Sequence, residues 1–394
     1  MRDLDDPYTG LADLRDNNPV ARFGDSEFYA VTSWDLIAEA VARTDDFSSN
    51  LTATMVWHDD GQVTGFPVAE LGSSLHVLAT ADDPRHRMHR RIIMPSLTAR
   101  RVSRLEPFIE QTLVDLWATG VVGDRVDWVE SIAQRLPMAV VAELLGLPDY
   151  DIDELIRWSF ASTVLLDGVV TADQLESATA AVGELSAYLT AAFDRALAEP
   201  GDDVLGDLAR LVHCGDLDQD SAVMILIQLV AAGAESTVSL LGTSVWLLAR
   251  HPDIVAALAA DRELIPVFVE EVLRLESPFR GHYRHVVSDT TLGQTPLPAG
   301  SHLYLMWGAA NRDPAIFDYA DSISLDPSDR RSHMAFGKGI HLCVGAPLAR
   351  LEARLGIAQL LDATSEFRLA SPDPQWERSL MVRRLTTLPL ILAG

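Results

Sequence analysis

The chain has 394 residues, of which 48% are hydrophobic, and its formal net charge is −26 at pH 7. This length and composition can support a large buried core. The negative charge argues against nucleic acid or an anionic membrane as a partner, because phosphate binding depends on clustered Lys and Arg. The first residues lack the basic flank and apolar stretch of a signal peptide, and no apolar run approaches the roughly 20 residues of a membrane span. We therefore expect a soluble, cytoplasmic protein.

In chain order, the first predicted element is a short strand at 27–32. Apolar residues at three-to-four spacing then predict α-helices at 106–118, 130–146, 175–198, 221–250 and 262–276. A second strand is predicted at 303–306, after likely turns at 291–293 and 297–300. Repeats and Ser/Gly linkers are not found. The sequence predicts a mainly α fold with a minor β portion, in a single domain covering residues 1–394.

Positive charge is concentrated between residues 81 and 104. This segment holds two acids, Asp82 and Asp83, and seven arginines, at positions 85, 87, 90, 91, 100, 101 and 104. The segment is either a solvated helix face or a docking patch or anion site, and both interpretations stay open. His86 and Arg90 are four residues apart, which places them on one helical face.

The predicted helix from about Asp220 to Arg250 has a polar interruption. Its apolar first half runs into Gly233-Ala234-Glu235-Ser236-Thr237 before the sequence becomes apolar again. Gly costs about 1 kcal/mol relative to Ala in a helix, and an ionised Glu in a core costs several kcal/mol more. A purely structural reason for this interruption is therefore hard to supply. The alternative to a functional role is a kinked helix in which Glu235 reaches solvent.

Only two cysteines are present, Cys214 and Cys343, and no disulfide framework is indicated. Cys343 comes just before a predicted helix that has Pro347 in its first turn. A helix N-terminus lowers a thiol pKa and favours the thiolate that binds metal. The alternative is a buried free cysteine in a Gly-rich turn. Cys214 lies in a predicted loop and is interpreted as incidental.

The segment around Cys343 resembles the haem-binding signature of cytochromes P450, Phe-x-x-Gly-x-His/Arg-x-Cys-x-Gly. The matching residues are Phe336, Gly339, His341, Cys343 and Gly345. The resemblance implies the cytochrome P450 fold, with haem b held between a long central kinked helix and the cysteine loop. It also implies that the Cys343 thiolate is the axial iron ligand, that His341 binds a haem propionate, and that Phe336 packs beside the sulfur.

Other segments resemble further parts of this family's pattern. Glu271 and Arg274 resemble its Glu-x-x-Arg pair, although this spacing alone usually reports a surface ion pair, and we expect Arg312 as the third member. His86, Arg90 and Arg284 resemble its propionate-binding residues, whereas His89 and Arg91 have no assigned role and are expected at the surface.

The interruption at 232–237 resembles the family's oxygen-binding segment, in which an acid and an alcohol relay protons to dioxygen. Glu235 is the expected acid. Ser236 stands where threonine is usual, so the sequence leaves open whether Ser236 or Thr237 serves as the alcohol.

The resemblance implies a monooxygenase that inserts one atom of O2 into a small organic substrate. No flavin or nicotinamide fingerprint is found, so electrons from NAD(P)H are expected through a ferredoxin and its reductase. Residues 85–104, with Arg330, Arg331 and Lys338, are a candidate docking face. The alternatives are a peroxide-driven peroxygenase, which commonly lacks the acid-alcohol pair, and a haem-binding sensor without turnover.

The substrate cannot be read from the sequence. By resemblance, residues 64–78 form a mobile lid over a mostly apolar pocket. The expected pocket residues are Gln228, Ala231, Ala232, Phe279, Arg280 and Met381. Arg280 or Gln228 is the candidate to engage a polar substrate group. We expect a monomer.

Overall fold

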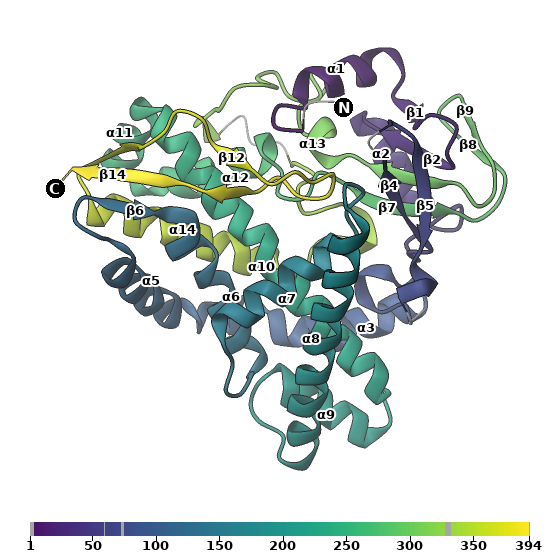
Figure 1. The fold of residues 1–394 in the computed structure, drawn as a ribbon, viewed down its shortest axis with the longest axis horizontal. Coiled ribbons are helices and arrows are strands. Elements are labelled where there is room, and N and C mark those ends of the chain that lie inside the picture. Colours follow the sequence, from purple (N-terminus) through teal and green to yellow (C-terminus); the bar gives the residue numbers. More distant parts are fainter. Residues whose placement is uncertain (1–3, 59, 72–74, 328–331, 394) are drawn as a thin grey trace.

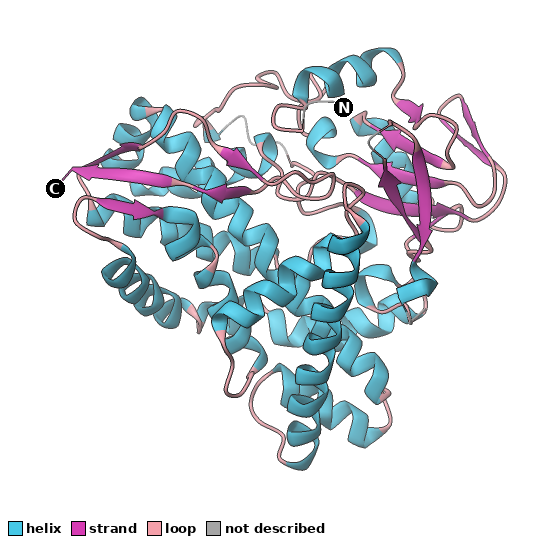
Figure 2. Ribbon diagram, in the orientation of Figure 1, coloured by secondary structure: helices cyan, strands magenta, loops and turns pink. Residues whose placement is uncertain are grey.

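The protein is described here from a computed structural model that covers residues 4–58, 60–71, 75–327 and 332–393. Helices form most of it, and the strands gather in two regions, of which one contains a five-stranded sheet and the other a three-stranded sheet (Figures 1 and 2). The α-helices are α1 (Tyr8–Asn17), α2 (Trp34–Ala42), α3 (Arg85–Ile93), α4 (Ala99–Ser103), α5 (Glu106–Gly120), α6 (Arg135–Leu145), α7 (Ile152–Val164), α8 (Ala172–Ala198), α9 (Val204–Cys214), α10 (Gln219–Arg250), α11 (Pro252–Ala260), α12 (Ile265–Leu275), α13 (Trp307–Ala310) and α14 (Ala346–Ala363).

Shorter helical turns and strands connect these helices. The 3-10 turns are η1 (Val68–Leu71), η2 (Leu78–Thr80), η3 (Met94–Leu97), η5 (Arg262–Leu264) and η7 (Gly339–His341), and η4 (Val129–Ala133) is a π-helical turn. The strands are β1 (Val20–Arg22), β2 (Phe28–Val31), β3 (Phe47–Ser48), β4 (Ala53–Trp57), β5 (Val63–Pro67), β6 (Arg125–Asp127), β7 (His282–Val286), β8 (Thr290–Leu292), β9 (Thr295–Leu297), β10 (His302–Leu305), β11 (Glu366–Leu369), β12 (Gln375–Trp376), β13 (Leu385–Thr387) and β14 (Pro389–Ala393).

The largest sheet joins segments from both ends of the chain. Its strand order is β1-β2-β10-β7-β3, with β10 parallel to β2 and antiparallel to β7. Both predicted strands, at 27–32 and 303–306, are members of this sheet. The pairing of β2 with β10 brings the N-terminal segment beside α13 and the chain that leads to Cys343.

Helix α10 runs through the middle of the helical part and packs against α6, α7, α8, α12 and α14 (Figure 1). It begins where the Asp218 carboxylate accepts a hydrogen bond from the Ser221 N–H at 2.7 Å, as an N-cap does. By length and composition it could cross a membrane, but more than half of its most apolar stretch is buried inside the fold, as in a core helix.

The predicted helices are present with small differences at their ends. The predicted 130–146 helix is divided into η4 and α6, and the predicted 262–276 helix into η5 and α12. Pro266 lies in the first turn of α12, where the missing N–H of proline costs nothing. Cys214 is the last residue of α9 and not part of a loop, because Gly215 ends the helix in a left-handed conformation.

Helix α14 buries an acid that has no ion-pair partner among the described residues. Glu352 is 1% exposed, and burial alone raises its pKa well above 4.5. The unfolded chain therefore loses this proton near pH 4.5 while the folded chain keeps it, so stability falls as pH rises.

We expect Glu352→Gln to flatten this pH dependence. Between pH 5 and 8, wild type should lose up to about 1.4 kcal/mol of unfolding free energy per pH unit relative to the variant. Urea unfolding of both proteins across this range measures the difference, and parallel curves would contradict the prediction.

Candidate active site

The cysteine loop closes on itself directly before α14. The Cys343 N–H donates to the Phe336 carbonyl at 2.9 Å, and the Gly337 N–H donates to the Met334 carbonyl at 2.9 Å. Gly337 and Gly339 have φ values of +71° and +75°, which disfavour any side chain. Cys343 thus precedes the N-terminus of α14, as the sequence predicts.

The Cys343 thiol reaches accessible space, yet the protein around it raises its pKa. Burial is the main cause, and it outweighs the N–H groups of Gly345 and Ala346 and the charge of Arg90, which all lower the pKa. The N–H groups at the start of α14 therefore lower the thiol pKa as predicted, but burial outweighs them and the net shift is upward. A bound metal cation stabilises the thiolate much more strongly than backbone dipoles do.

The four predicted propionate-binding residues come together beside this loop. The rings of His86 and His341 lie 4.1 Å apart between centroids. Burial, followed by the charges of Arg284, His86 and Arg90, lowers the pKa of His341 to about 3. Its Nε2 is buried and has no hydrogen-bond partner among the described residues.

Arg284 is the most deeply placed cation of this group. It is 9% exposed, burial lowers its pKa to about 10, and its guanidinium donates to the carbonyl of the neighbouring Tyr283 at 2.7 Å. Among the residues that the structure describes, no carboxylate lies at hydrogen-bond distance from it, and a buried guanidinium in this situation is costly. The cluster therefore fits a group that carries carboxylates, such as the two propionates of haem, and the accessible Cys343 sulfur fits its iron.

Helix α3 carries His86 and Arg90 on one face, as predicted. His86 is buried, with Nδ1 3.4 Å from an Asp83 carboxylate oxygen. His89 was expected at the surface but is fully buried, because its Nδ1 accepts a hydrogen bond from the Leu78 N–H at 3.2 Å. This contact ties α3 to the end of the predicted lid. Residues 72–74 of that lid lie outside the described residues.

An ion-pair network that the sequence did not reveal holds the other side of the loop. Arg350 of α14 stacks on the Phe336 ring, 4.5 Å from its centroid, and donates two hydrogen bonds to Glu270, at 2.7 and 2.8 Å. Burial raises the pKa of Glu270, but Arg350 and His333 outweigh it and hold that pKa at about 2. Phe336 and Cys343 are thus fixed relative to α12.

Glu271 and Arg274 form the predicted pair inside the protein. Arg274 donates to both Glu271 carboxylate oxygens at 2.8 Å, and only 4% of its side chain is exposed. Its remaining N–H groups donate to the carbonyls of Asn311, Tyr319, Ala320 and Ser322. The guanidinium therefore fastens the 311–322 segment to α12.

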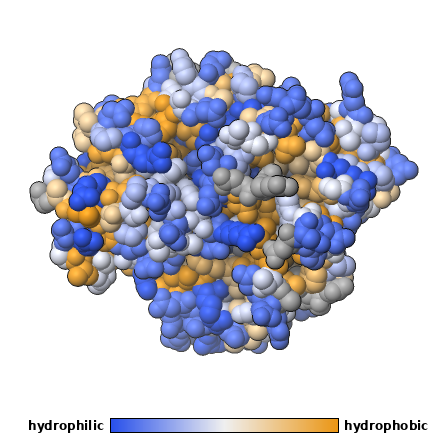
Figure 3. Space-filling view, turned by 45° about the horizontal axis from the view of Figure 1, so that its top comes forward, coloured by the Kyte–Doolittle hydropathy of each residue, from blue (hydrophilic) through white to orange (hydrophobic). Residues whose placement is uncertain are grey.

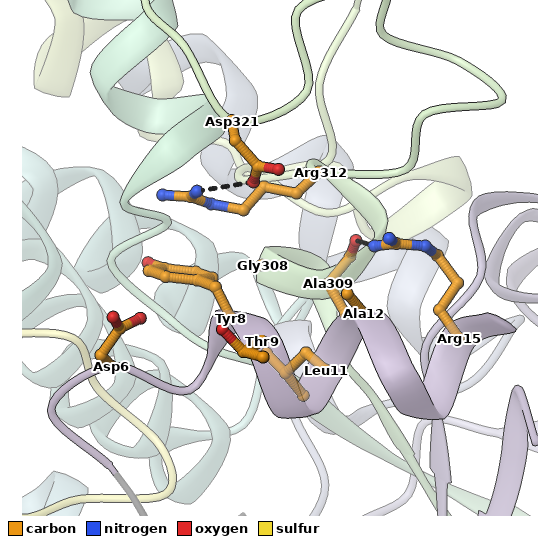
Figure 4. A pocket seen from close by; sticks show the side chains of 10 residues that line it. All are labelled: Asp6, Tyr8, Thr9, Leu11, Ala12, Arg15, Gly308, Ala309, Arg312 and Asp321. Atoms are coloured by element: carbon orange, nitrogen blue, oxygen red, sulfur yellow. Dashed lines mark hydrogen bonds and ion pairs between the residues drawn. The ribbon is translucent and has the colours of Figure 1, made fainter. Parts of the chain in front are cut away.

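Arg312 is not the third member of this pair, contrary to the prediction. It pairs with Asp321 at 3.0 Å and Glu276 at 3.2 Å, and its guanidinium lies 3.5 Å from the centroid of the Tyr8 ring. There it lines a surface pocket of about 390 Å³ between α1 and α13 (Figure 4). Neighbouring side chains point in different directions from this short segment. Arg312 therefore faces the surface pocket, whereas Asn311 connects Arg274 to the cysteine segment.

Asn311 connects the buried pair to the cysteine segment. Its backbone carbonyl accepts from Arg274, and its side-chain oxygen accepts from the Met334 N–H at 2.6 Å. Asn311 also donates to the Ser277 hydroxyl at 2.8 Å. The sequence prediction was thus one residue away, since it named Arg312 and the contact with Arg274 is made by Asn311.

The polar interruption of α10 lies inside the fold. Glu235 is 2% exposed, which rules out the alternative in which it reaches solvent. The Ser236 hydroxyl donates to the Ala232 carbonyl at 2.9 Å, and the Thr237 hydroxyl to the Gly233 carbonyl at 3.1 Å. Such back-bonding bends helices without breaking them, and α10 is continuous here.

Arg384, which the sequence interpretation missed, is the partner of Glu235. Its Nε donates to a Glu235 carboxylate oxygen at 2.9 Å, and 7% of the Arg384 side chain is exposed. Burial raises the pKa of Glu235, although Arg384 and Thr163 lower it. The two charges lie 149 residues apart, so no local spacing could have revealed the pair.

The predicted pocket residues divide into two groups. Ala231 and Ala232 lie on the more accessible face of α10, and Gln228 links the same helix to η2, accepting from the Ala79 N–H and donating to the Thr80 hydroxyl. Met381 is buried in a cluster against which Phe279 packs.

Arg280 does not point to a substrate site as predicted. Its guanidinium donates to the carbonyls of Leu4 at 2.6 Å and Val382 at 3.0 Å, which fastens the N-terminal segment.

Comparisons with known proteins agree with this arrangement. A family model for cytochrome P450 matches residues 209–381. Cytochrome P450 144 of Mycobacterium tuberculosis is 49% identical over 98% of this chain and 89% of its own length, and 6-deoxyerythronolide B hydroxylase of Saccharopolyspora erythraea is 34% identical over 99% and 96%. The structure of cytochrome P450 CREJ in complex with (4-ethylphenyl) dihydrogen phosphate superposes with a TM-score of 0.90 at 27% identity, covering 99% of this chain and 98% of that one. The chain therefore belongs to the cytochrome P450 family of haem-thiolate monooxygenases.

Proposed function

We propose that this cytochrome P450 is a cytoplasmic, single-domain monomer that oxidises a mostly apolar small organic substrate with electrons from a ferredoxin. The observation that carries oxygen activation is the buried Glu235 beside Ser236, since neither a sensor nor a peroxide-driven enzyme needs a buried proton donor. The haem supplies the oxidative chemistry when bound, and the protein positions the substrate and moves protons.

Each part of the site then has a role. Cys343 is the axial ligand, and its loop is held by Arg350 and by Asn311. His86, Arg90, Arg284 and His341 bind the propionates, which would place carboxylates beside the two guanidinium groups. Phe336 shields the region of the sulfur.

Glu235 and Ser236 form the proton relay. Ser236 is half-buried and adjoins the exposed Ala232, whereas Thr237 is 3% exposed and packs toward the core. Ser236 is therefore the better placed alcohol. A protonated Glu235 gives its proton through the Ser236 hydroxyl toward the dioxygen site and is then reprotonated from solvent.

We expect Glu235→Gln to lower substrate-dependent NADH consumption at least about tenfold in a chain reconstituted with ferredoxin and reductase. Ser236→Ala should divert electrons from product to peroxide, and Thr237→Ala should divert far fewer. Product yield per NADH measures both effects. Full product yield with H2O2 alone, undiminished in Glu235→Gln, would support the peroxygenase instead.

The pocket favours an apolar substrate. Ala231 and Ala232 present methyl groups on α10, and the two polar candidates, Arg280 and Gln228, are both hydrogen-bonded within the protein. The lid at 64–78 would cover this pocket. A screen of the ferric protein for compounds that shift its Soret band identifies ligands directly, and binding only of polar or charged compounds would contradict an apolar pocket.

The arginine-rich segment is the proposed ferredoxin docking face. Arg87 is paired with Asp83 and Arg101 with Asp207, whereas Arg100 and Arg104 are exposed. Lys338 lies over the Trp34 ring, 5.4 Å from its centroid, and Arg330 and Arg331 lie outside the described residues. Figure 3 shows hydrophilic residues over much of one face of the molecule, with hydrophobic areas between them. Because the proposed docking residues are arginines, charge is expected to guide docking to an acidic ferredoxin.

We expect the double variant Arg100→Glu and Arg104→Glu to slow reduction by an acidic ferredoxin about tenfold or more at low salt, with the difference shrinking as salt rises. Arg368→Glu, an exposed change on β11, is the matched control and should have little effect. Stopped-flow reduction measures the rates. Equal rates in both variants would remove this face as the docking site.

A further inference from the structure

Arg384 bridges two carboxylates that differ greatly in exposure. Its Nε donates to Glu235, which is 2% exposed, and its Nη2 donates to Glu377 at 2.8 Å, whose side chain is 41% exposed. The Glu377 N–H also donates to the Arg384 carbonyl at 2.8 Å, which fixes the turn between β12 and β13. The guanidinium lies 4.1 Å from the centroid of the Phe160 ring of α7. One side chain thus spans the distance from the core of α10 to the protein surface.

We propose that Arg384 is a positioning residue for Glu235 and that Glu377 competes for the same guanidinium, so that the shift of Arg384 between them controls when the buried acid takes up a proton. This inference rests on the proposed relay through Glu235 and Ser236. It assigns the surface end of that relay to the β12–β13 turn.

The electrostatics favour such a competition. Burial raises the pKa of Glu235, Arg384 of the β12–β13 turn and Thr163 of α7 lower it, and the charge of Asp167 raises it. Contact with Arg384 therefore favours the ionised form of Glu235, whereas burial favours the neutral form. When the guanidinium moves toward Glu377, the Glu235 carboxylate binds a proton from solvent water and becomes a neutral acid.

The neutral acid no longer holds the guanidinium and is free to turn toward Ser236. After it gives up the proton, the carboxylate is regenerated and pairs with Arg384 again. The cycle moves one proton from solvent to the dioxygen site and leaves every side chain in its starting charge state.

A purely structural role is the competing explanation, because Arg384 also ties the C-terminal segment to α10. The two are separated by the protonation of Glu235 itself. In the substrate-bound ferric holoenzyme, infrared difference spectroscopy follows the carbonyl stretch of a protonated carboxylic acid as pH changes. The Glu235 band is the one that disappears in Glu235→Gln.

We expect Arg384→Gln to raise the midpoint of this titration by at least about one pH unit, since a buried counter-ion is removed. Glu377→Gln should lower the midpoint, because Arg384 then pairs with Glu235 alone. Arg384→Lys, which keeps the charge, should move the midpoint back toward wild type. The control is Arg378→Gln, an exposed neighbour of Glu377, which should leave the midpoint unchanged.

The pH profile of product yield per NADH should shift in the same directions. Midpoints that are the same in Arg384→Gln, Glu377→Gln and Arg378→Gln would overturn the inference. If Arg384→Gln does not fold, the surface variant Glu377→Gln decides alone. Unchanged product yield in Glu235→Gln would instead overturn the proposed relay.

Discussion

Replacement of Cys343 by alanine should abolish the red-shifted absorption of the reduced, carbon-monoxide-bound protein and all substrate oxidation with it. The thiolate is the electron-donating ligand that favours O–O cleavage, and no other sulfur or imidazole in the cysteine loop can replace it in the same place. His341 is the nearest nitrogen donor in sequence, but it belongs to the group of predicted propionate-binding residues with His86 and Arg284. Difference spectra and product formation measure the two losses.

Cys214→Ala is the matched control for this experiment. Cys214 is exposed at the end of α9 and the structure gives it no partner among the described residues, so its spectra and activity should equal those of wild type. Cys343→Ser separates the ligand from the fold, because it keeps the shape of the loop while removing the sulfur. A normal carbon-monoxide spectrum in Cys343→Ala would refute the ligand assignment.

Much of the helical part could be predicted from the sequence, because its information is local. The apolar spacing of α5, α8 and α10 and the Pro347 start of α14 depend on neighbouring residues only. The motif around Cys343 also lies within ten consecutive residues. The β1-β2-β10-β7-β3 sheet could not be predicted in this way, because pairing of β2 with β10 joins residues some 270 positions apart.

Partner choice within the site was the least predictable feature, for the same physical reason. The ion pairs of Glu235 with Arg384 and of Glu276 with Arg383 join α10 and the end of α12 to the C-terminal turn. Such buried pairs depend on tertiary placement and leave no periodic signal. The error over Arg312 is of the same kind, since Asn311 contacts Arg274 through its backbone carbonyl and Met334 through its side-chain amide.

The second large effect is expected from Arg274→Ala. Removing this guanidinium leaves four backbone carbonyls without this donor, and it leaves the Glu271 carboxylate, whose side chain is 17% exposed, with the Ser324 N–H but without its counter-ion. Breaking a buried pair in this way costs about 3–5 kcal/mol. The 311–322 segment would then be released, and with it Asn311, which holds Met334 ahead of the cysteine loop. We therefore expect little haem-loaded protein and a strongly lowered urea midpoint.

Arg274→Lys tests whether charge alone is sufficient. Lysine cannot donate in the fixed fork that reaches Glu271 and the carbonyls together, so it should recover only part of the stability. Arg135→Ala is the matched control, because the Arg135–Asp153 pair is largely exposed and its loss should cost less than about 1 kcal/mol. Comparable urea midpoints for Arg274→Ala and Arg135→Ala would mean that the buried pair does not secure the cysteine segment, and that Arg350 and Glu270 hold it without help.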